Sequence, residues 1–333
     1  MLTDNNFNIA SPGGIEISIP VTIDEESDIY LKLKEPSEIQ NYYQENGYVV
    51  FRNLIPEELC DRVKITFDQE IKTYQGYIYR QTTASPEKNK FTENGYVINP
   101  LLNIQDLRAK DFPNFKNAAL SVITHNNIYD AVKTILGEEG ILVQSMYFEG
   151  NSATAAHQDT YYLDSAEIGR MTAAWIAVED IHPGAGRFYV YPGSHKIEMA
   201  KNSGDLDIAF NHSRYQDLVL KIIAEEKLEC HAPALRKGDV LFWAARTIHG
   251  SLQTKNMEVS RCSFTSHFIP ASTNFMLFQR QHKPLNLRKI NSFNVHCPKD
   301  RDKLKNRAIF YLETRFPKAY QFAKNVAIKM LLG

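Results

Sequence analysis

The chain has few cysteines, almost no net charge and no long hydrophobic run. Its four cysteines are scattered through the 333 residues, and no two of them form a Cys-x-x-Cys pair. They are Cys60, Cys230, Cys262 and Cys297. This spacing argues against a zinc ribbon and a disulfide scaffold, and it suits a reducing cytoplasm. Because 38 basic side chains stand against 39 acidic ones, for a formal net charge of -1, we expect no general affinity for nucleic acid.

Membrane and export signals are missing as well. No apolar run is long enough to span a bilayer, and the first residues lack the basic and apolar pattern of a signal peptide. We therefore expect a cytoplasmic protein without a transmembrane segment, and the sequence leaves its oligomeric state open. Hydrophobic residues form 43% of the chain, which is ample for a large core at this length.

Two histidines and an aspartate carry the clearest chemical signal. Of the ten histidines, only His157 has an acidic residue two positions further on, and that residue is Asp159. On a β-strand, residues i and i+2 share a face, so both side chains would point at one metal ion. His249 follows an apolar run, residues 239–243, that is typical of a buried strand. Two imidazoles and one carboxylate are the ligands of a non-haem Fe(II) oxygenase, which keeps its other coordination positions open.

The surroundings of these residues favour a metal site over a coincidence. An H-x-D pattern alone is common, and its histidine is more often simply hydrogen-bonded. Here it belongs to an ordered series: QSMYF (144–148), HQDTYY (157–162), WIAV (175–178), GRFYVYPGSH (186–195) and the run 238–251. With the upstream block 43–59, this series resembles the phytanoyl-CoA dioxygenase family of Fe(II)/2-oxoglutarate-dependent oxygenases, over residues 37–270.

The resemblance implies a role for each matching residue. The implied iron ligands are His157, Asp159 and His249, and the implied contacts of 2-oxoglutarate are Arg261, Ser251, Trp175 and Gln144. A guanidinium suits the distal carboxylate because its paired donors match the two oxygens. The spacing from His249 to Arg261 is about one residue longer than is usual in the family. A slip of one residue along a strand would turn Arg261 away and leave the carboxylate to Arg246.

Short strand-like runs separated by turns predict an α+β fold, with a double-stranded β-helix (a cupin-like jelly roll) as a core flanked by helices. The expected strands are residues 48–55, 141–149, 172–179, 188–191, 239–244 and 259–269. The expected helices are residues 36–45, 56–74, 117–136 and 303–332, and residues 76–110 are expected to form a loop.

The composition divides the chain into three parts. Residues 1–36 are polar and mixed, which predicts a loosely attached N-terminal arm, and residues 37–279 form the expected dioxygenase domain. A charged, largely helical insertion is expected at 196–229, as a wall or lid of the pocket or as a surface excursion. Residues 280–333 contain thirteen Lys and Arg against three acidic residues. We expect this basic helical extension to pack on the acidic domain, and contact with an anionic membrane surface is the less favoured alternative.

The resemblance further implies an activity: Fe(II), 2-oxoglutarate and O2 hydroxylate an unactivated C–H bond, and succinate and CO2 are formed. Asp159 argues against halogenation, because halogenating relatives carry a small residue at this position. The residues expected to face the substrate are Met146, Phe148, Tyr161, Tyr162, Arg170, Arg246 and Phe264. This mixture of aromatic and cationic groups suits a small or medium-sized anionic or hydroxylated molecule, such as an acyl thioester, an amino acid derivative or a specialised metabolite. Tyr161 and Tyr162 fit core and rim packing equally well.

Two other classes of protein remain open from the residues alone. A jelly-roll binding protein would keep the fold without redox chemistry, but it has no need of the full set His157, Asp159, His249 and Arg261. A zinc-dependent hydrolase also uses two histidines and a carboxylate, but it gives no reason for Arg261.

Overall fold

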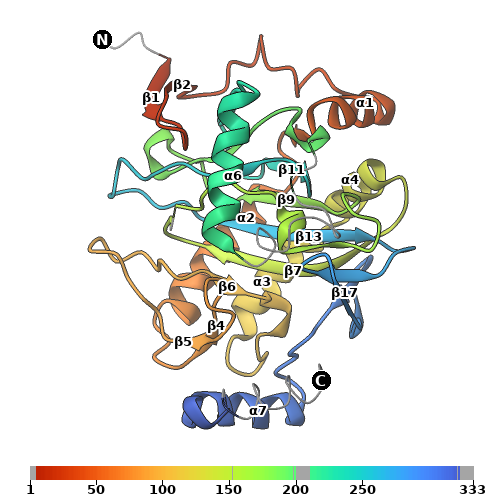
Figure 1. The fold of residues 1–333 in the computed structure, drawn as a ribbon. Helices are drawn as coiled ribbons and strands as arrows, with labels where there is room; N and C mark the ends of the chain where they lie inside the picture. Colours follow the sequence, from red (N-terminus) through yellow and green to blue (C-terminus); the bar gives the residue numbers. More distant parts are fainter. Residues whose placement is uncertain (1–4, 152, 198, 200–210, 321, 323–333) are drawn as a thin grey trace.

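The core of the protein is an eight-stranded, mostly antiparallel sheet (Figure 1). The computed structural model describes residues 5–151, 153–197, 199, 211–320 and 322. In spatial order the strands are β16 (Leu287–Ile290), β17 (Phe293–His296), β7 (Gly140–Phe148), β13 (Ser263–Pro270), β9 (Thr172–Ala177), β11 (Val240–Ala244) and β3 (Tyr48–Phe51), and β6 (Leu101–Leu102) pairs with β7. The expected strands from 48 to 269 all form, with ends shifted by a few residues.

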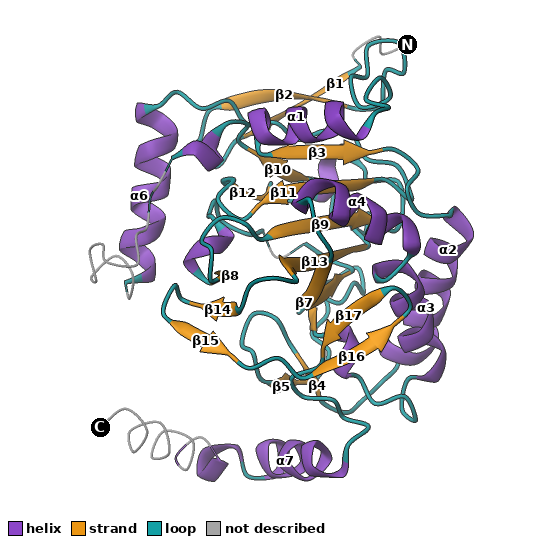
Figure 2. Ribbon diagram, turned by 90° about the vertical axis from the view of Figure 1, so that its right-hand side faces the viewer, coloured by secondary structure: helices purple, strands orange, loops and turns teal. Residues whose placement is uncertain are grey.

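A second group of short strands lies on the side of this sheet opposite α2 (Glu57–Thr66) and α3 (Pro113–Ile123). It consists of β10 (Phe188–Val190) paired with β12 (His249–Ser251), and of β8 (Leu163–Ser165), β14 (Phe275–Leu277) and β15 (Gln281–Lys283). In Figure 2, β8, β14 and β15 are seen at the left, and α2 and α3 at the right. An isolated antiparallel bridge between His157 and His249 adds one more segment beside β12. These two facing layers, with helices outside them, confirm the expected α+β class and jelly-roll core.

Helices cover the outer side of the large sheet and build the main hydrophobic core there. They are α1 (Pro36–Asn46), α2 (Glu57–Thr66), η1 (Phe67–Ile71), α3 (Pro113–Ile123) and α4 (Asn126–Leu136). Side-chain alternation decides which strand residues join this core. On β13, Phe264 and Phe268 face the helices, and Thr265 and His267 face the opposite way, into the interior of the jelly roll. The shorter elements are β4 (Ile78–Tyr79), β5 (Pro86–Glu87), η2 (Ile104–Asp106), η3 (Asp159–Tyr161), η4 (Pro183–Ala185) and η5 (Ser194–Lys196).

The N-terminal segment is a packed hairpin rather than the loose arm expected from its composition. Strands β1 (Asn6–Ala10) and β2 (Glu16–Pro20) pair with each other. Ile9 and Ile19 point to one side and are 3% and 2% exposed, in a cluster with Tyr189 of β10. The alternation of apolar and polar residues along both strands therefore places the apolar side chains on one buried face of the hairpin.

The C-terminal extension also differs from the helix-only expectation. It first supplies β15, β16 and β17, and β17 runs parallel to β7 at one side of the large sheet. Helix α7 (Leu304–Arg315) follows, and Glu313 accepts a hydrogen bond from the hydroxyl of Tyr79 at 2.5 Å. Residues 321 and 323–333 of the expected helix lie outside the described residues. Among the described helices, none has the length and apolar character needed to cross a membrane.

The expected insertion contains helix α6 (His212–Glu225), which stands upright beside the two sheet layers (Figure 1). Residues 198 and 200–210 of this insertion lie outside the described residues. The buried side chains of α6 are Tyr215, Val219 and Ile223, which are spaced by four residues and so form one stripe facing the protein.

The C-terminal strands predict a stability test. Phe293 of β17 is fully buried, with its ring centroid 5.2 Å from that of Tyr129 and 5.3 Å from that of Phe268. We expect Phe293→Ala to lower the free energy of unfolding by about 3–5 kcal/mol, because the change removes a buried ring and leaves a cavity. Urea unfolding measures the change. Phe316→Ala is the control, because this ring is 54% exposed; equal effects of the two variants would contradict the packing described.

Candidate active site

A cavity of about 450 Å³ lies between the two layers of the jelly roll. Its floor is built from inward-facing residues of neighbouring strands, because every second side chain of a strand points the same way. These residues are Gln144, Met146 and Phe148 of β7, Trp175 of β9, Trp243 of β11, and Thr265 and His267 of β13. His157, Asp159, His249, Ser251 and Arg261 also line the cavity. The iron ligands and the 2-oxoglutarate contacts implied by the sequence therefore share one space.

The backbone around His157 brings the two histidines together. The N–H of His157 donates to the carbonyl of His249, and the N–H of His249 donates to the carbonyl of His157, both at 3.0 Å. Gln158 is extended, with φ -102° and ψ 137°, so His157 and Asp159 point to the same side. The strand expected for this motif is only a single bridge, because Asp159 already begins the short helix η3.

The three implied ligand side chains converge on one point. The Nε2 atoms of His157 and His249 lie 3.6 and 3.4 Å from Oδ1 of Asp159, and the ligand atoms of all three residues lie within 4.8 Å of one another. Nδ1 of His157 and Nδ1 of His249 each lie 2.8 Å from a backbone carbonyl oxygen. A carbonyl only accepts, so each Nδ1 carries the hydrogen and each Nε2 presents a lone pair. This donor set fits an iron ion.

The ionisation of the site also suits a metal. Burial acts to raise the pKa of the Asp159 carboxyl, but the nearby imidazoles of His249 and His267 outweigh it and hold that pKa well below its usual range. Burial lowers the pKa of His249, which favours the neutral imidazole. At neutral pH Asp159 therefore offers an anionic oxygen, the form that binds a cation.

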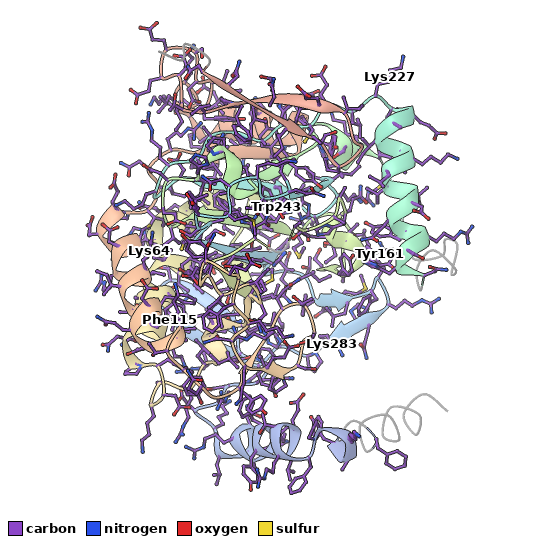
Figure 3. All side chains as sticks on the ribbon, turned by 90° about the vertical axis from the view of Figure 1, so that its left-hand side faces the viewer. Lys64, Phe115, Tyr161, Lys227, Trp243 and Lys283 are labelled. Carbon is purple, nitrogen blue, oxygen red and sulfur yellow. The ribbon has the colours of Figure 1, made fainter. Side chains whose placement is uncertain are left out.

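Two aromatic residues that the sequence reading did not assign to the site hold the second oxygen of Asp159. The indole N–H of Trp243 donates to Oδ2 at 2.8 Å, and Nε2 of His267 lies 3.4 Å from the same atom. Trp243 is deep in the interior between the layers (Figure 3). His267 lies six residues beyond Arg261, so strand alternation from Arg261 would have placed both on one face. Because Oδ2 is held in this way, the other oxygen of the carboxylate, Oδ1, faces His157 and His249.

Arg261 is a buried cation that faces the cavity. It is 2% exposed, its Nη1 donates to the carbonyl of Gly186 at 3.1 Å, and its Nε has no hydrogen-bond partner among the described residues. Its guanidinium carbon lies 5.4 Å from the ring centroid of Phe148 and 5.9 Å from that of Trp175. Burial lowers its pKa to about 10, so it stays protonated at neutral pH. In the described part of the chain no carboxylate pairs with it, which fits a site for an anionic ligand.

The alternative anchor, Arg246, does not line the cavity. Its side chain lies against Gly169, where an added Cβ would be 3.0 Å from the Arg246 Nε. Ser251, in contrast, lines the cavity, as Arg261 does; its hydroxyl accepts from the Thr154 N–H at 2.7 Å and donates to Asn151 at 3.0 Å. Despite the longer loop before it, Arg261 therefore lines the same cavity as His157 and His249.

The residues expected to face the substrate separate into two groups. Met146, Phe148 and Tyr162 line the cavity. The other four do not, and the expectation is corrected for them. Phe264 faces the helices with its ring centroid 4.9 Å from that of Tyr147, and Tyr161 stacks on Tyr215 at 3.8 Å. Arg170 pairs with Glu138 and Glu167 at the surface, and Arg246 lies against Gly169 as described.

Other parts of the chain complete the cavity wall. Helix α6 contributes His212 and Gln216. The segment expected as a loop over residues 76–110 contributes Gln81, Thr82, Ala84 and Leu102. Apart from Asp159 and Arg261, the described lining residues include no Asp, Glu, Lys or Arg.

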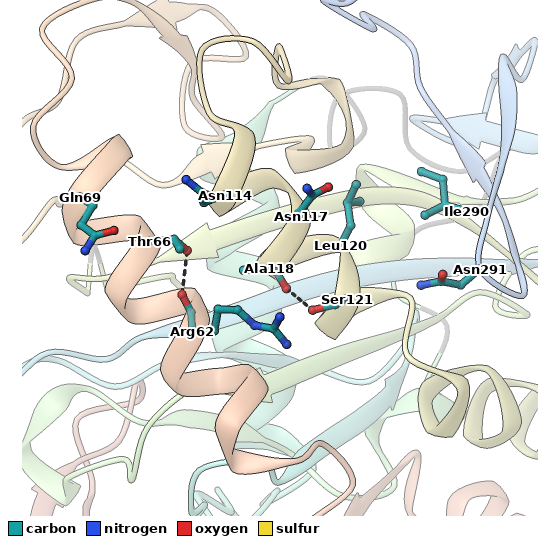
Figure 4. A pocket seen from close by; sticks show the side chains of 10 residues that line it. All are labelled: Arg62, Thr66, Gln69, Asn114, Asn117, Ala118, Leu120, Ser121, Ile290 and Asn291. Carbon is teal, nitrogen blue, oxygen red and sulfur yellow. Dashed lines mark hydrogen bonds between the residues drawn. The ribbon is translucent and has the colours of Figure 1, made fainter.

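A larger groove of about 790 Å³ lies on the outer side of the protein, away from these residues (Figure 4). It runs between α2 and α3 and reaches Ile290 and Asn291. The hydroxyls of Thr66 and Ser121 in this groove bond to carbonyls of their own helices, at 2.7 Å each. Its lining combines amides, hydroxyls and one guanidinium without a convergent set of catalytic groups, so the inner cavity is the active-site candidate.

The jelly-roll fold and the set of two histidines and one aspartate together fit the class of non-haem iron oxygenases. A sequence profile of phytanoyl-CoA dioxygenase (PhyH) matches residues 43–261. The chain belongs to the phytanoyl-CoA dioxygenase family.

Curated relatives agree with this membership. The chain is 24% identical to the human peroxisomal phytanoyl-CoA dioxygenase over 251 residues, which cover 72% of this chain and 70% of the relative. It is 25% identical over 273 residues to the phytanoyl-CoA dioxygenase domain-containing protein 1 of Bos taurus, with 71% and 90% covered.

Two crystal structures illustrate the shared fold. The epimerase SnoN from nogalamycin biosynthesis, in complex with Fe3+, alpha ketoglutarate and nogalamycin RO, has a TM-score of 0.53 at 16% identity; 80% of this chain and 96% of SnoN are covered. EctD from S. alaskensis, with 2-oxoglutarate and 5-hydroxyectoine, has a TM-score of 0.51 at 14% identity, with 76% and 86% covered. At these identities the likeness concerns the fold.

The ligand set predicts the result of removing either histidine. We expect His157→Ala and His249→Ala each to abolish stoichiometric Fe(II) binding, because one nitrogen and one carboxylate remain and the described residues offer no second cluster of this kind. Anaerobic titration with Fe(II) measures this. His282→Ala, which changes an exposed histidine of β15 outside the cavity, is the matched control. Near-normal Fe(II) binding in either ligand variant would contradict the proposed metal site.

Proposed function

We propose that this protein is an Fe(II)/2-oxoglutarate-dependent dioxygenase that hydroxylates a C–H bond of a small or medium-sized organic molecule. The observation that carries the proposal is Arg261, a buried guanidinium without a carboxylate partner in the described chain, in the cavity that also holds His157, Asp159 and His249. A binding protein has no need of that combination. A zinc hydrolase would account for the three ligands, but it would leave the buried cation without a purpose.

The ligand count agrees with this proposal. Two histidines and Asp159 would hold the ion and would leave its other coordination positions open for 2-oxoglutarate and O2. Iron, when bound, supplies the oxidative decarboxylation of 2-oxoglutarate to succinate and CO2 and the coupled oxidation of the substrate.

The residues of the chain supply binding and orientation. Arg261 would hold the distal carboxylate of 2-oxoglutarate with two parallel N–H donors, and Ser251, which lines the same cavity, would assist it. Phe148 and Trp175 flank the guanidinium and exclude water from that ion pair, which strengthens it. Gln144, on β7 at the same wall, is the proposed polar contact at the other end of the cosubstrate.

The wall of the cavity narrows the substrate class. Because Arg170 and Arg246 do not reach the cavity, the cationic groups that favoured an anionic substrate are absent from its described lining. Met146, Tyr162 and Leu163 provide apolar surface, and the side chains from α6 and residues 81–82 provide hydrogen bonds. This wall suits an uncharged, hydroxylated or ring-bearing molecule. An amino acid derivative, a specialised metabolite, or the acyl end of a thioester meets that description.

Hydroxylation is the reaction we propose within this class. The neighbouring structures include a carbocyclase, SnoK, and an epimerase, SnoN, both described as non-heme and alpha ketoglutarate dependent. All three outcomes begin with the same cosubstrate, so consumption of 2-oxoglutarate tests the class and product analysis separates the outcomes.

The class is tested by titrating the protein anaerobically with Fe(II) and 2-oxoglutarate. We expect a weak visible metal-to-ligand charge-transfer band, which arises when 2-oxoglutarate chelates Fe(II). Three protein ligands leave the two free positions that this chelation requires. In air, we expect slow release of succinate and CO2 even without substrate. Fe(II) binding without the band and without succinate would reject the oxygenase and leave a binding protein or a hydrolase.

The cosubstrate contact gives a sharper prediction. We expect Arg261→Ala to raise the dissociation constant of 2-oxoglutarate by about one to three orders of magnitude, because loss of one partner of a buried charge pair costs on the order of 2–5 kcal/mol. Arg261→Lys should restore part of the affinity, since an ammonium keeps the charge but not the paired donors. Fe(II) affinity should change little in both variants.

Arg246→Ala is the matched control for this experiment, because it removes a guanidinium that lies outside the cavity. Appearance of the charge-transfer band during the titration measures both constants. If Arg261→Ala binds 2-oxoglutarate normally and Arg246→Ala does not, the assignment of Arg261 is wrong.

A further inference from the structure

Helix α6 contacts the segment that carries two of the three implied iron ligands at several points. The ring of Tyr215 stacks on that of Tyr161, with centroids 3.8 Å apart and planes 13° apart. Figure 3 shows Tyr161 beside this helix. One turn earlier in α6, Nε2 of His212 lies 2.7 Å from the hydroxyl of Tyr162. The ring of Tyr162 in turn packs edge-on against His157, with centroids 5.5 Å apart.

The hydroxyl of Tyr215 reaches furthest into the ligand segment. It accepts a hydrogen bond from the backbone N–H of Gln158 at 2.9 Å and lies 3.3 Å from the carbonyl of Gln158, to which it can donate. Gln158 is the residue between the ligands His157 and Asp159, and it is 1% exposed. A single side chain from the insertion therefore satisfies the backbone N–H of this residue, which has no access to water.

Other contacts hold the two ligands themselves but do not reach this N–H. His157 is fixed by its backbone bridge with His249, and Asp159 by Trp243. The extended conformation of Gln158 is what aims both ligands to the same side. Without the Tyr215 hydroxyl, the buried N–H of Gln158 would lose its described partner, and rotation of the peptide toward water would change the angle between the two ligands.

We propose that Tyr215 is a positioning residue for the iron site, and that the insertion helix α6 thereby couples the substrate wall to the ligand pair His157 and Asp159. His212 and Gln216 of the same helix line the cavity. A molecule that contacts them acts on the element that holds Gln158 in place. This inference rests on the proposed function in one respect: the ion whose ligands are positioned is taken to be Fe(II).

The first test compares two tyrosines that lose the same atom. Tyr215→Phe removes the hydroxyl that contacts Gln158. Tyr189→Phe removes a hydroxyl from the same hydrophobic cluster that is equally buried and has no hydrogen-bond partner among the described residues. We expect Tyr215→Phe to weaken Fe(II) binding about 10-fold and to shift the visible band of the Fe(II) and 2-oxoglutarate complex, since partners that orient metal ligands commonly act at this level. Tyr189→Phe should do neither.

The melting temperature of the metal-free protein separates positioning from general stability. If Tyr215→Phe lowers it while Fe(II) affinity and the band match those of the wild type, the role is structural and the proposal is overturned. If the wild type itself binds no Fe(II), the proposed function fails first, so the two failures are distinguishable.

A second measurement covers the case in which Tyr215→Phe does not fold. In the wild-type protein, anaerobic addition of Fe(II) and 2-oxoglutarate should slow backbone hydrogen exchange in residues 157–162 and also in α6, because coupling between two elements acts in both directions. Protection confined to residues 157–162, with α6 unchanged, would contradict the coupling.

Discussion

The active site depends on the mutual backbone pairing of His157 and His249. Each residue donates its N–H to the carbonyl of the other, so two distant parts of the chain are joined at the two imidazole ligands themselves. The ring centroids are then 4.3 Å apart, and the bonds from each Nδ1 to a carbonyl set the rotation of each ring. The protein therefore orders these ligand side chains when it folds. The free energy of metal binding then does not include the entropic cost of ordering them.

The charges in the cavity have opposite signs and different environments. Asp159 is a buried anion whose second oxygen is hydrogen-bonded by Trp243, and Arg261 is a buried cation that has one carbonyl acceptor in the described chain. A cation in that state is costly to bury, so the surrounding sheet must hold it there. A metal ion together with a dianionic cosubstrate would balance both charges. The metal ion would bind Asp159, and one carboxylate of the cosubstrate would pair with Arg261.

The sequence predicted the parts of the site that depend on local chain geometry. That His157 and Asp159 point to the same side was predictable, because H-x-D needs only an extended residue between its members, which Gln158 provides. Alternation along β13 also predicts the orientation of Phe264. Thr265 and His267 of β13 face the cavity, so Phe264 must face the helices. Arg170 and Arg246 could not be placed in this way, because their positions depend on surface ion pairs and on packing against Gly169. The pairing of the N-terminal hairpin and of β17 likewise depends on contacts distant in sequence.

Helix α6 had no sequence pattern that linked it to the metal, yet its geometry gives it two roles at once. His212, Tyr215 and Gln216 are three and four residues apart, so they lie on one side of the helix. Tyr215 on that side is fixed to Gln158, whereas His212 and Gln216 face the cavity. The contact at Tyr215 thus sets the distance of the two wall residues from the ligands. In the proposed function, the position of a substrate beside the ion would then depend on α6 as well as on the sheet, although the helix contributes none of the three ligands.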